Sequence, residues 1–193
     1  MNFKSWLLSL ILVCPLLSSS LFAAEEVGQF TSGARKQGLY SALELGGLFM
    51  LGLDREFSNG WVVGVKAGYD VFRTFGFEGF LRFSGHESNN LTVTSGVTPT
   101  FFAYQVGGLL KGAYPVTRRL FVGAALGGGV FITNPNSKPT RTSATHGMFT
   151  AELNAEYFMR TRGISFGLNP SISGIQNHKS AILQASSYLR YSF

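Results

Sequence analysis

The chain has 193 residues, with 16 Lys and Arg against 10 Asp and Glu, and a formal net charge of +6 at pH 7. Charged residues make up only 13% of it and hydrophobic residues 45%, with 24 glycines and 18 phenylalanines. Since a soluble domain carries roughly 25% charged residues, this composition argues against an ordinary soluble domain and favours a membrane setting.

The amino-terminal segment has the three-part layout of a secretory signal peptide. Lys4 precedes an apolar stretch over residues 6–17, and small residues follow up to Ala23 and Ala24, after which Glu25 begins an acidic pair. The apolar stretch is shorter than the about 20 residues of a spanning helix. We predict cleavage after Ala23 or Ala24. The predicted organisation is a signal peptide over 1–24, an amino-terminal lead over 25–37 and a folded domain over 38–193.

Cys14 is the only cysteine and lies inside this predicted signal. A lipoprotein signal needs a small residue before its cysteine, but Val13 stands there and Pro15 follows. We therefore expect cleavage to remove Cys14 and to leave a chain without an internal disulfide.

No segment after the signal is apolar for long enough to form a spanning helix. The longest strictly apolar run, over 120–132, has 13 residues and includes four glycines. Because only helices and closed barrels satisfy all backbone polar groups inside lipid, two classes remain. One is a secreted soluble β domain such as a β-sandwich, and the other is a transmembrane β-barrel.

Alternation of apolar and polar residues with a period of two marks the strands. Over 149–159 every odd position is apolar, whereas the even positions include Glu152 and Glu156. The segments 61–72 and 120–132 alternate in the same way. Most of the marked segments are longer than the common globular strand of about 5–6 residues, which favours the transmembrane barrel. Eight strands are predicted, over residues 38–53, 60–72, 75–84, 100–114, 119–132, 148–159, 163–175 and 180–193.

The connections between these strands differ at the two ends of the predicted sheet. Short links over 115–118 and 160–163 alternate with long polar links over 85–99 and 133–147, as in outer-membrane barrels. Residues 54–60 are predicted to be a tight turn, and Pro170 is expected to mark a bulge in its strand. If residues 90–97 form a further strand, the barrel has ten strands instead of eight.

The sequence resembles the small outer-membrane barrels of Gram-negative bacteria, the OmpA/OmpX-like outer membrane β-barrel domain group. The residues that carry this resemblance are 39–47, 114–117 with 120–127, and the terminal 189–193. In that group the barrel assembly machinery reads a terminal strand that ends on phenylalanine. The resemblance therefore implies an assembly signal formed by Leu189, Tyr191 and Phe193. It also implies export to the cell outer membrane, contact with outer-membrane lipid, lipopolysaccharide and periplasmic chaperones, and a monomeric state.

The predicted register places charged side chains inside the barrel. An eight-stranded barrel is just wide enough to be filled by side chains, and buried charges must pair. We therefore expect a plugged interior of ion pairs, with a narrow porin-like conduit as the alternative. The predicted interior charge network consists of Glu44, Lys66, Asp70, Glu78, Arg82, Lys111, Glu152, Glu156 and Arg190.

We find no pattern in the sequence that indicates catalysis, a cofactor or a metal. His86, His146 and His178 fall in predicted outer loops, and we see no histidine and serine on one strand face as in lipid A deacylases. Basic residues such as Arg118 and Arg160 lie at the short-turn rim, without the interleaved aromatic residues of a nucleic-acid site. The sequence thus predicts a barrel with a structural or surface-interaction role. A channel is the alternative, and an outer-membrane lipid hydrolase comes third.

Overall fold

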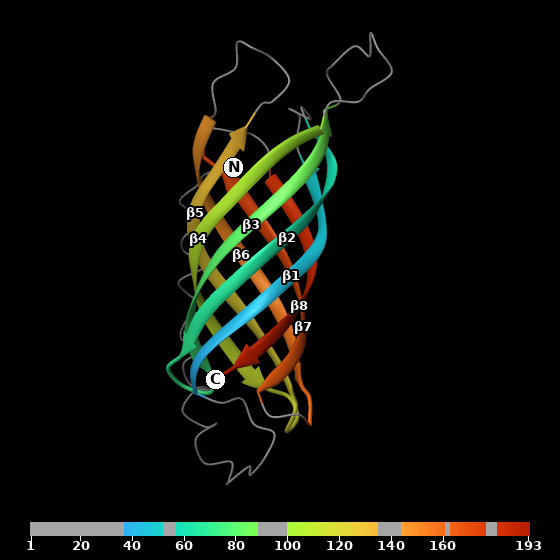
Figure 1. Ribbon diagram of the computed structural model, residues 1–193. Helices are drawn as coiled ribbons and strands as arrows, with labels where there is room; N and C mark the ends of the chain where they lie inside the picture. Colours follow the sequence, from blue (N-terminus) through green and yellow to red (C-terminus); the bar gives the residue numbers. More distant parts are fainter. Residues whose placement is uncertain (1–36, 52–56, 89–99, 135–143, 161–162, 177–180) are drawn as a thin grey trace, which may run out of the picture. The chain divides into compact units, whose positions relative to one another are not determined.

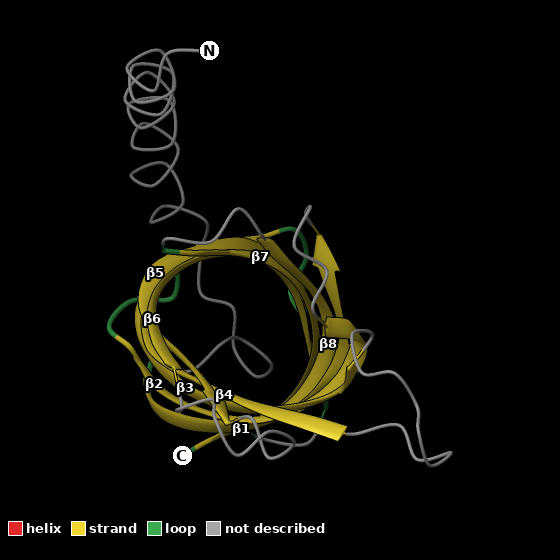
Figure 2. Cartoon of the chain, turned by 90° about the horizontal axis from the view of Figure 1, so that it is seen from above, coloured by secondary structure: helices red, strands yellow, loops and turns green. Residues whose placement is uncertain are grey.

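In the computed structural model, residues 37–51, 57–88, 100–134, 144–160, 163–176 and 181–193 are described, and they form a closed antiparallel β-barrel (Figures 1 and 2). Each strand pairs with its neighbours in chain order, so the barrel is of the up-and-down type. This confirms the predicted fold class. The strands are β1 (Gly38–Leu51), β2 (Phe57–Asp70), β3 (Phe75–Ser88), β4 (Thr100–Pro115), β5 (Leu120–Asn134), β6 (Ala144–Phe158), β7 (Ile164–Ile175) and β8 (Ala181–Ser192).

The last strand closes the sheet against the first. β8 pairs with β1 from Tyr40↔Ser192 to Leu51↔Ala181, and the backbone N–H of Phe193 donates to the Leu39 carbonyl at 3.1 Å. The direct pairing of β1 with β8 closes an eight-stranded sheet, which decides against the ten-strand alternative. Residues 90–97, on which that alternative depended, lie outside the described residues.

The strands are staggered around the barrel. Following paired residues from Ser41 through every strand leads back to β1 at Leu51, ten residues further along. Stagger and strand number together fix the tilt of the strands, about 35–45° in barrels of this type, and the width of the interior.

Three short turns lie at one end of the barrel, which we call the short-turn rim. In the β2–β3 turn, the backbone N–H of Phe72 donates to the Phe75 carbonyl at 3.0 Å, and the backbone N–H of Phe75 donates to the Phe72 carbonyl at 3.4 Å. In the β4–β5 turn, the Thr117 hydroxyl accepts the backbone N–H of Leu120 at 3.0 Å. The β6–β7 turn ends at Gly163, whose φ of +83° is a conformation that suits glycine.

The two faces of each strand differ in polarity. The exposed face is apolar and the buried face is largely polar, which is the opposite of the arrangement in a soluble protein. Side chains that face outward are mostly exposed and apolar, whereas buried polar and charged residues outnumber the buried apolar ones among the described residues. Aromatic contacts cluster near both ends, with Trp61 against Phe83 at one end and Tyr191 against Phe193 at the other. Apolar outer bands edged with aromatic residues are typical of membrane barrels. The described part of the chain has no helix that could cross a membrane.

Three strands extend further than the sequence pattern indicates. β2 begins at Phe57, inside the predicted turn over 54–60, with an irregular register between Phe57 and Gly60. β3 continues to Ser88 and β6 begins at Ala144, so both enter predicted loops. Apolar alternation stops where the membrane band ends, but backbone pairing continues beyond it, and a hydrophobicity pattern cannot detect that continuation.

Pro170 interrupts one ladder without shifting it, so the expected bulge is absent. On the β6 side the pairs Glu152↔Ser171 and Ala155↔Leu168 keep the same register, with no partners assigned between them. On the β8 side Pro170 pairs with Ala185 in a continuous ladder. The missing N–H of proline therefore weakens the sheet on one side only.

Candidate functional site: the barrel interior

All nine charged residues of the predicted interior network are buried inside the barrel. They come from β1, β2, β3, β4, β6 and β8, so the closed sheet brings together residues that are far apart in the sequence. Each occupies an inward position of a strand whose neighbours face outward. The residues are Glu44, Lys66, Asp70, Glu78, Arg82, Lys111, Glu152, Glu156 and Arg190.

A central cluster links opposite walls of the barrel. The Lys66 ammonium lies 2.9 Å from Glu152, 3.0 Å from Glu78 and 3.8 Å from Glu44. The Arg82 guanidinium pairs with Glu44 at 3.0 Å and also with Glu152. Lys66 is on β2 and Glu152 on β6, four strands apart in a ring of eight, so this ion pair crosses the lumen.

A second cluster lies nearer the short-turn rim. Arg190 pairs with Asp70 and lies 3.3 Å from Glu156, while Lys111 lies 3.7 Å from the same Glu156 carboxylate. The Ser165 hydroxyl donates to Glu156 at 2.6 Å. Each acid in this cluster therefore has a cationic partner, as burial of charge requires.

Tyr40 connects the two clusters. Its hydroxyl donates to Glu78 of the central cluster at 2.8 Å, and the Arg190 guanidinium lies over its ring at 3.7 Å from the centroid. The charged interior is thus one continuous network rather than separate ion pairs.

Neutral polar side chains of β7 and β8 complete the surroundings of Glu44. Gln184 donates to Glu44 at 2.6 Å and Asn169 at 3.3 Å, and the Ser186 hydroxyl also bonds this carboxylate. Sequence reasoning missed these residues because it selected charged side chains only. The same period-two alternation that located the charges would have located them.

Buried apolar residues lie on either side of the charges along the barrel. Phe121 and Phe158 meet edge to face at the short-turn rim, with ring centroids 5.3 Å apart. Toward the opposite end lies a cluster of buried apolar residues. It includes Leu48, Ala103, Phe131, Met148, Ile175 and Ile182.

Inward glycines provide the space for the large interior side chains. A Cβ at Gly68 would lie 2.5 Å from the Tyr40 ring, and a Cβ at Gly167 would overlap the Tyr188 ring. These glycines therefore allow close packing, because the tyrosine rings lie directly against the strand backbone at these positions.

The structure corrects the placement of two histidines. His86 and His146 lie on β3 and β6 rather than in loops, and His178 lies outside the described residues. His86 and Ser84 share the inward face of β3, with Nε2 and Oγ 3.0 Å apart, so a histidine and a serine do share a strand face. Both side chains are nearly inaccessible, Ser84 at 1% and His86 at 3% exposure. This burial separates the pair from lipid and from solvent.

Among the described residues, no three His, Cys, Asp or Glu side chains are arranged to hold a metal ion. The acids of the interior are instead engaged with Lys66, Lys111, Arg82 and Arg190. The arrangement is that of a packed core in which five acids meet four bases.

Comparison with known proteins identifies the class of this barrel. Over residues 9–186 the chain matches the family model of the outer membrane protein beta-barrel domain, and it belongs to this family. The protein is therefore an integral β-barrel of the Gram-negative outer membrane, in contact with the lipid of that membrane. The short-turn rim is accordingly its periplasmic end.

Solved structures of the same fold support this assignment. Neisserial surface protein A is 12% identical, with 81% of this chain and 97% of that chain covered and a TM-score of 0.59. Ail, the attachment invasion locus protein of Yersinia pestis, is 14% identical, with 81% and 100% covered and a TM-score of 0.50. At these identities the likeness is one of fold. A search of curated protein sequences gives no significant match.

The network predicts a large stability effect at Arg82. Arg82→Met leaves Glu44 and Glu152 with fewer cationic partners inside the barrel, and we expect a loss of about 3–5 kcal/mol in unfolding free energy. Urea unfolding in lipid vesicles, followed by the fluorescence of Trp61, measures it. The control Leu81→Met changes the adjacent outward side chain and should cost less than about 1.5 kcal/mol. Equal stability of the two variants would contradict the role of Arg82 in the network.

Proposed function

We propose that this protein is a closed outer-membrane barrel that conducts no solute and serves as a rigid support for the segments between its strands at the cell surface. The observation that carries the proposal is the filled lumen, in which Lys66 pairs with Glu152 across the barrel. Buried apolar residues lie at both ends of this network. A solute could pass through the barrel only if these ion pairs separated and the apolar side chains at both ends moved aside.

The narrow channel is the second candidate, since an interior lined with charges could select ions. Arg82 and Glu44 would be its selecting groups, but each is already engaged with partners inside the wall. Separating a buried pair leaves uncompensated charge and costs about 3–5 kcal/mol. The closed form is therefore favoured.

Planar-bilayer recording distinguishes these two functions. We expect the purified protein to give no steady, reproducible channel openings, because ion pairs and apolar side chains fill the lumen. An open outer-membrane porin reconstituted in parallel serves as the control for insertion. Uniform openings of the purified protein would overturn the closed-barrel proposal.

A surface-interaction role follows from a closed lumen, because the surface segments are then the parts left to contact other molecules. The segment between β5 and β6 contains Lys138 and Arg141 and no acid. The structure of Ail was solved in complex with the heparin analogue sucrose octasulfate. We propose that the basic segment of this chain contacts anionic polysaccharide outside the cell.

Charge removal in that segment tests the contact. Lys138→Gln with Arg141→Gln should weaken binding of cells to immobilised heparin, because fewer cations meet the sulfates. The control is Arg118→Gln at the opposite rim, which should leave binding unchanged. Undiminished binding by the double variant would contradict the proposal.

We propose that Leu189, Tyr191 and Phe193 form the signal for barrel assembly. All three face outward at the end of β8, where the closing strand meets β1, and Phe193 is 65% exposed. The other partners that we propose are lipopolysaccharide and periplasmic chaperones, with the protein acting as a monomer.

Replacement of the terminal residue tests the assembly signal. Phe193→Ser should reduce the folded, heat-modifiable form in outer-membrane fractions several-fold, because the machinery loses its recognition residue. The matched control is Phe72→Ser, since Phe72 is 59% exposed at the same rim. Equal yields from the two variants would show that Phe193 acts only as a rim aromatic.

That the protein is not an enzyme stays a prediction. It is supported by the burial of Ser84 and His86, which keeps their hydrogen-bonded pair away from lipid acyl groups. Lipid A or phospholipid acylation that changes on overexpression and reverts with His86→Ala would contradict it.

A further inference from the structure

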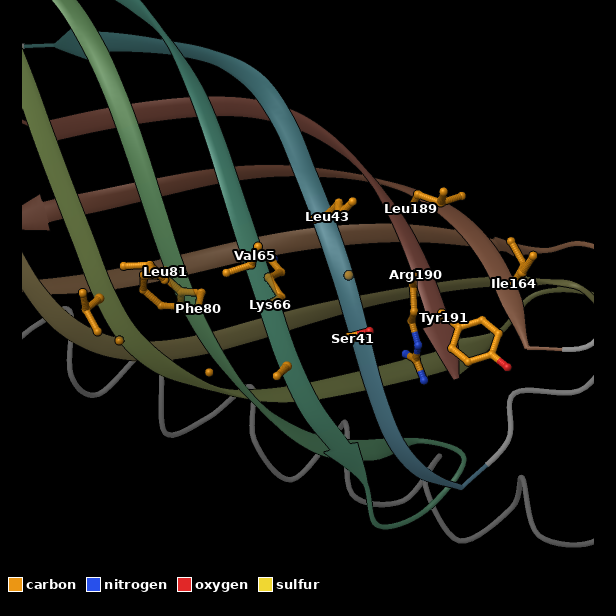
Figure 3. A pocket seen from close by; sticks show the side chains of 15 residues that line it. Ser41, Leu43, Val65, Lys66, Phe80, Leu81, Ile164, Leu189, Arg190 and Tyr191 are labelled. Atoms are coloured by element: carbon orange, nitrogen blue, oxygen red, sulfur yellow. The ribbon is translucent and has the colours of Figure 1, made fainter. Parts of the chain in front are cut away.

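An apolar groove of about 740 Å³ crosses the outer surface of the barrel (Figure 3). It runs from Ile164 on β7 across β8, β1, β2 and β3 to Val106 on β4. Ten of its fifteen lining residues belong to the outward face of the strands, so the groove opens toward the hydrocarbon of the membrane. The other five alternate with them on the inward face and include Lys66 and Arg190, whose side chains are buried in the barrel. Large outward side chains border it: Leu43, Val65, Leu81, Leu189 and Tyr191.

The floor of the groove consists of small residues in a single paired row. Ser41 is paired with Ala67, and Ala67 with Gly79, so three neighbouring strands present almost no side chain at the same level. From Ile164 to Val106 the groove spans five interstrand spacings, about 24 Å at roughly 4.8 Å each. A long groove with a mostly apolar lining fits an extended acyl chain.

The periplasmic end of the groove lies beside exposed positive charge. Ile164 closes the β6–β7 turn by accepting the backbone N–H of Met159 at 3.0 Å, and Arg160 follows Met159 on the surface. In the neighbouring β4–β5 turn the Arg119 carbonyl accepts the backbone N–H of Phe158 at 2.8 Å. Arginine is well suited to bind a phosphate, which is the charged group of a phospholipid at this depth.

Ser41 adds a polar group inside the apolar groove. Its side chain faces outward, and none of the described residues hydrogen-bonds it. A lone hydroxyl that faces hydrocarbon is unfavourable unless it donates to an acceptor. The ester carbonyl of a phospholipid offers such an acceptor between the headgroup and the acyl chain.

We propose that this groove binds an anionic phospholipid of the periplasmic leaflet, with one acyl chain over Ala67 and Gly79 and the phosphate near Arg160. A second copy of the chain in the same orientation fits less well. The described residues of the three short turns include Arg73, Arg118, Arg119 and Arg160 but no Asp or Glu, so two copies would bring like charges together.

Native mass spectrometry of the protein released from nanodiscs tests the site. The nanodiscs contain equal amounts of phosphatidylglycerol, which is anionic, and phosphatidylcholine, which is neutral overall. We expect the wild-type protein to retain one phosphatidylglycerol preferentially. Arg160→Gln should reduce this preference about fivefold, the effect of one cation near an anionic surface, and Arg160→Lys should preserve it.

Filling the groove provides the matched comparison. A Cβ at Gly79 lies 3.8 Å from its nearest neighbours and a Cβ at Gly112 lies 3.9 Å, so a side chain can begin at either outward position without a close contact. Gly79→Leu blocks the groove, whereas Gly112→Leu changes the outer face of β4 away from it. We expect Gly79→Leu to abolish lipid retention and Gly112→Leu to leave it intact. Ala67→Leu repeats the block on β2, and heat-modifiable migration identifies folded variants.

Three results would overturn the proposal. The first is equal lipid retention by the folded Gly79→Leu and Gly112→Leu proteins. The second is equal retention of phosphatidylglycerol and phosphatidylcholine by the wild-type protein. The third is a wild-type dimer that Gly79→Leu dissociates, because the groove would then be an interface between two copies.

Discussion

Inside hydrocarbon every backbone N–H and C=O must find a partner within the protein, and the pairing of β8 with β1 meets this requirement. With eight strands, a stagger that returns from Ser41 to Leu51 fixes both the tilt and the narrow width of the interior. A lumen of this width is just wide enough to be filled by side chains. Closure of the sheet therefore dictates how the interior is built.

The charged interior is a consequence of that closure. Once Glu44 and Arg82 are enclosed by the wall, neither can be left without an opposite charge or hydrogen bonds, because burial removes their hydration. The wall places Lys66 and Glu152 across from each other, and Tyr40 joins the two clusters. The network therefore joins strands from opposite walls and fills the middle of the barrel, and the proposed supporting role rests on this.

The same alternation shapes the outer surface. Residues between the inward charges face lipid, and most of them are large and apolar. Where the stagger aligns Ser41, Ala67 and Gly79 in one row, the apolar surface is hollowed. The groove ends near the β6–β7 turn that carries Arg160, so one register produces both the charged interior and the apolar groove on the outer surface.

The sequence alone determined the two-faced strands, because a period of two is a local property of neighbouring residues. This pattern predicts Glu44 and Glu152 on the inward face, and both side chains are buried in the barrel. Which charge meets which was decided only by the tertiary structure, since Lys66 reaches Glu152 through the stagger of eight closed strands. The burial of His86 was also decided there, because β3 continues pairing beyond the apolar band. Pairing between distant strands produces no periodic pattern in either segment. For this reason the local sequence pattern could not predict the partners of the buried charges or the burial of His86.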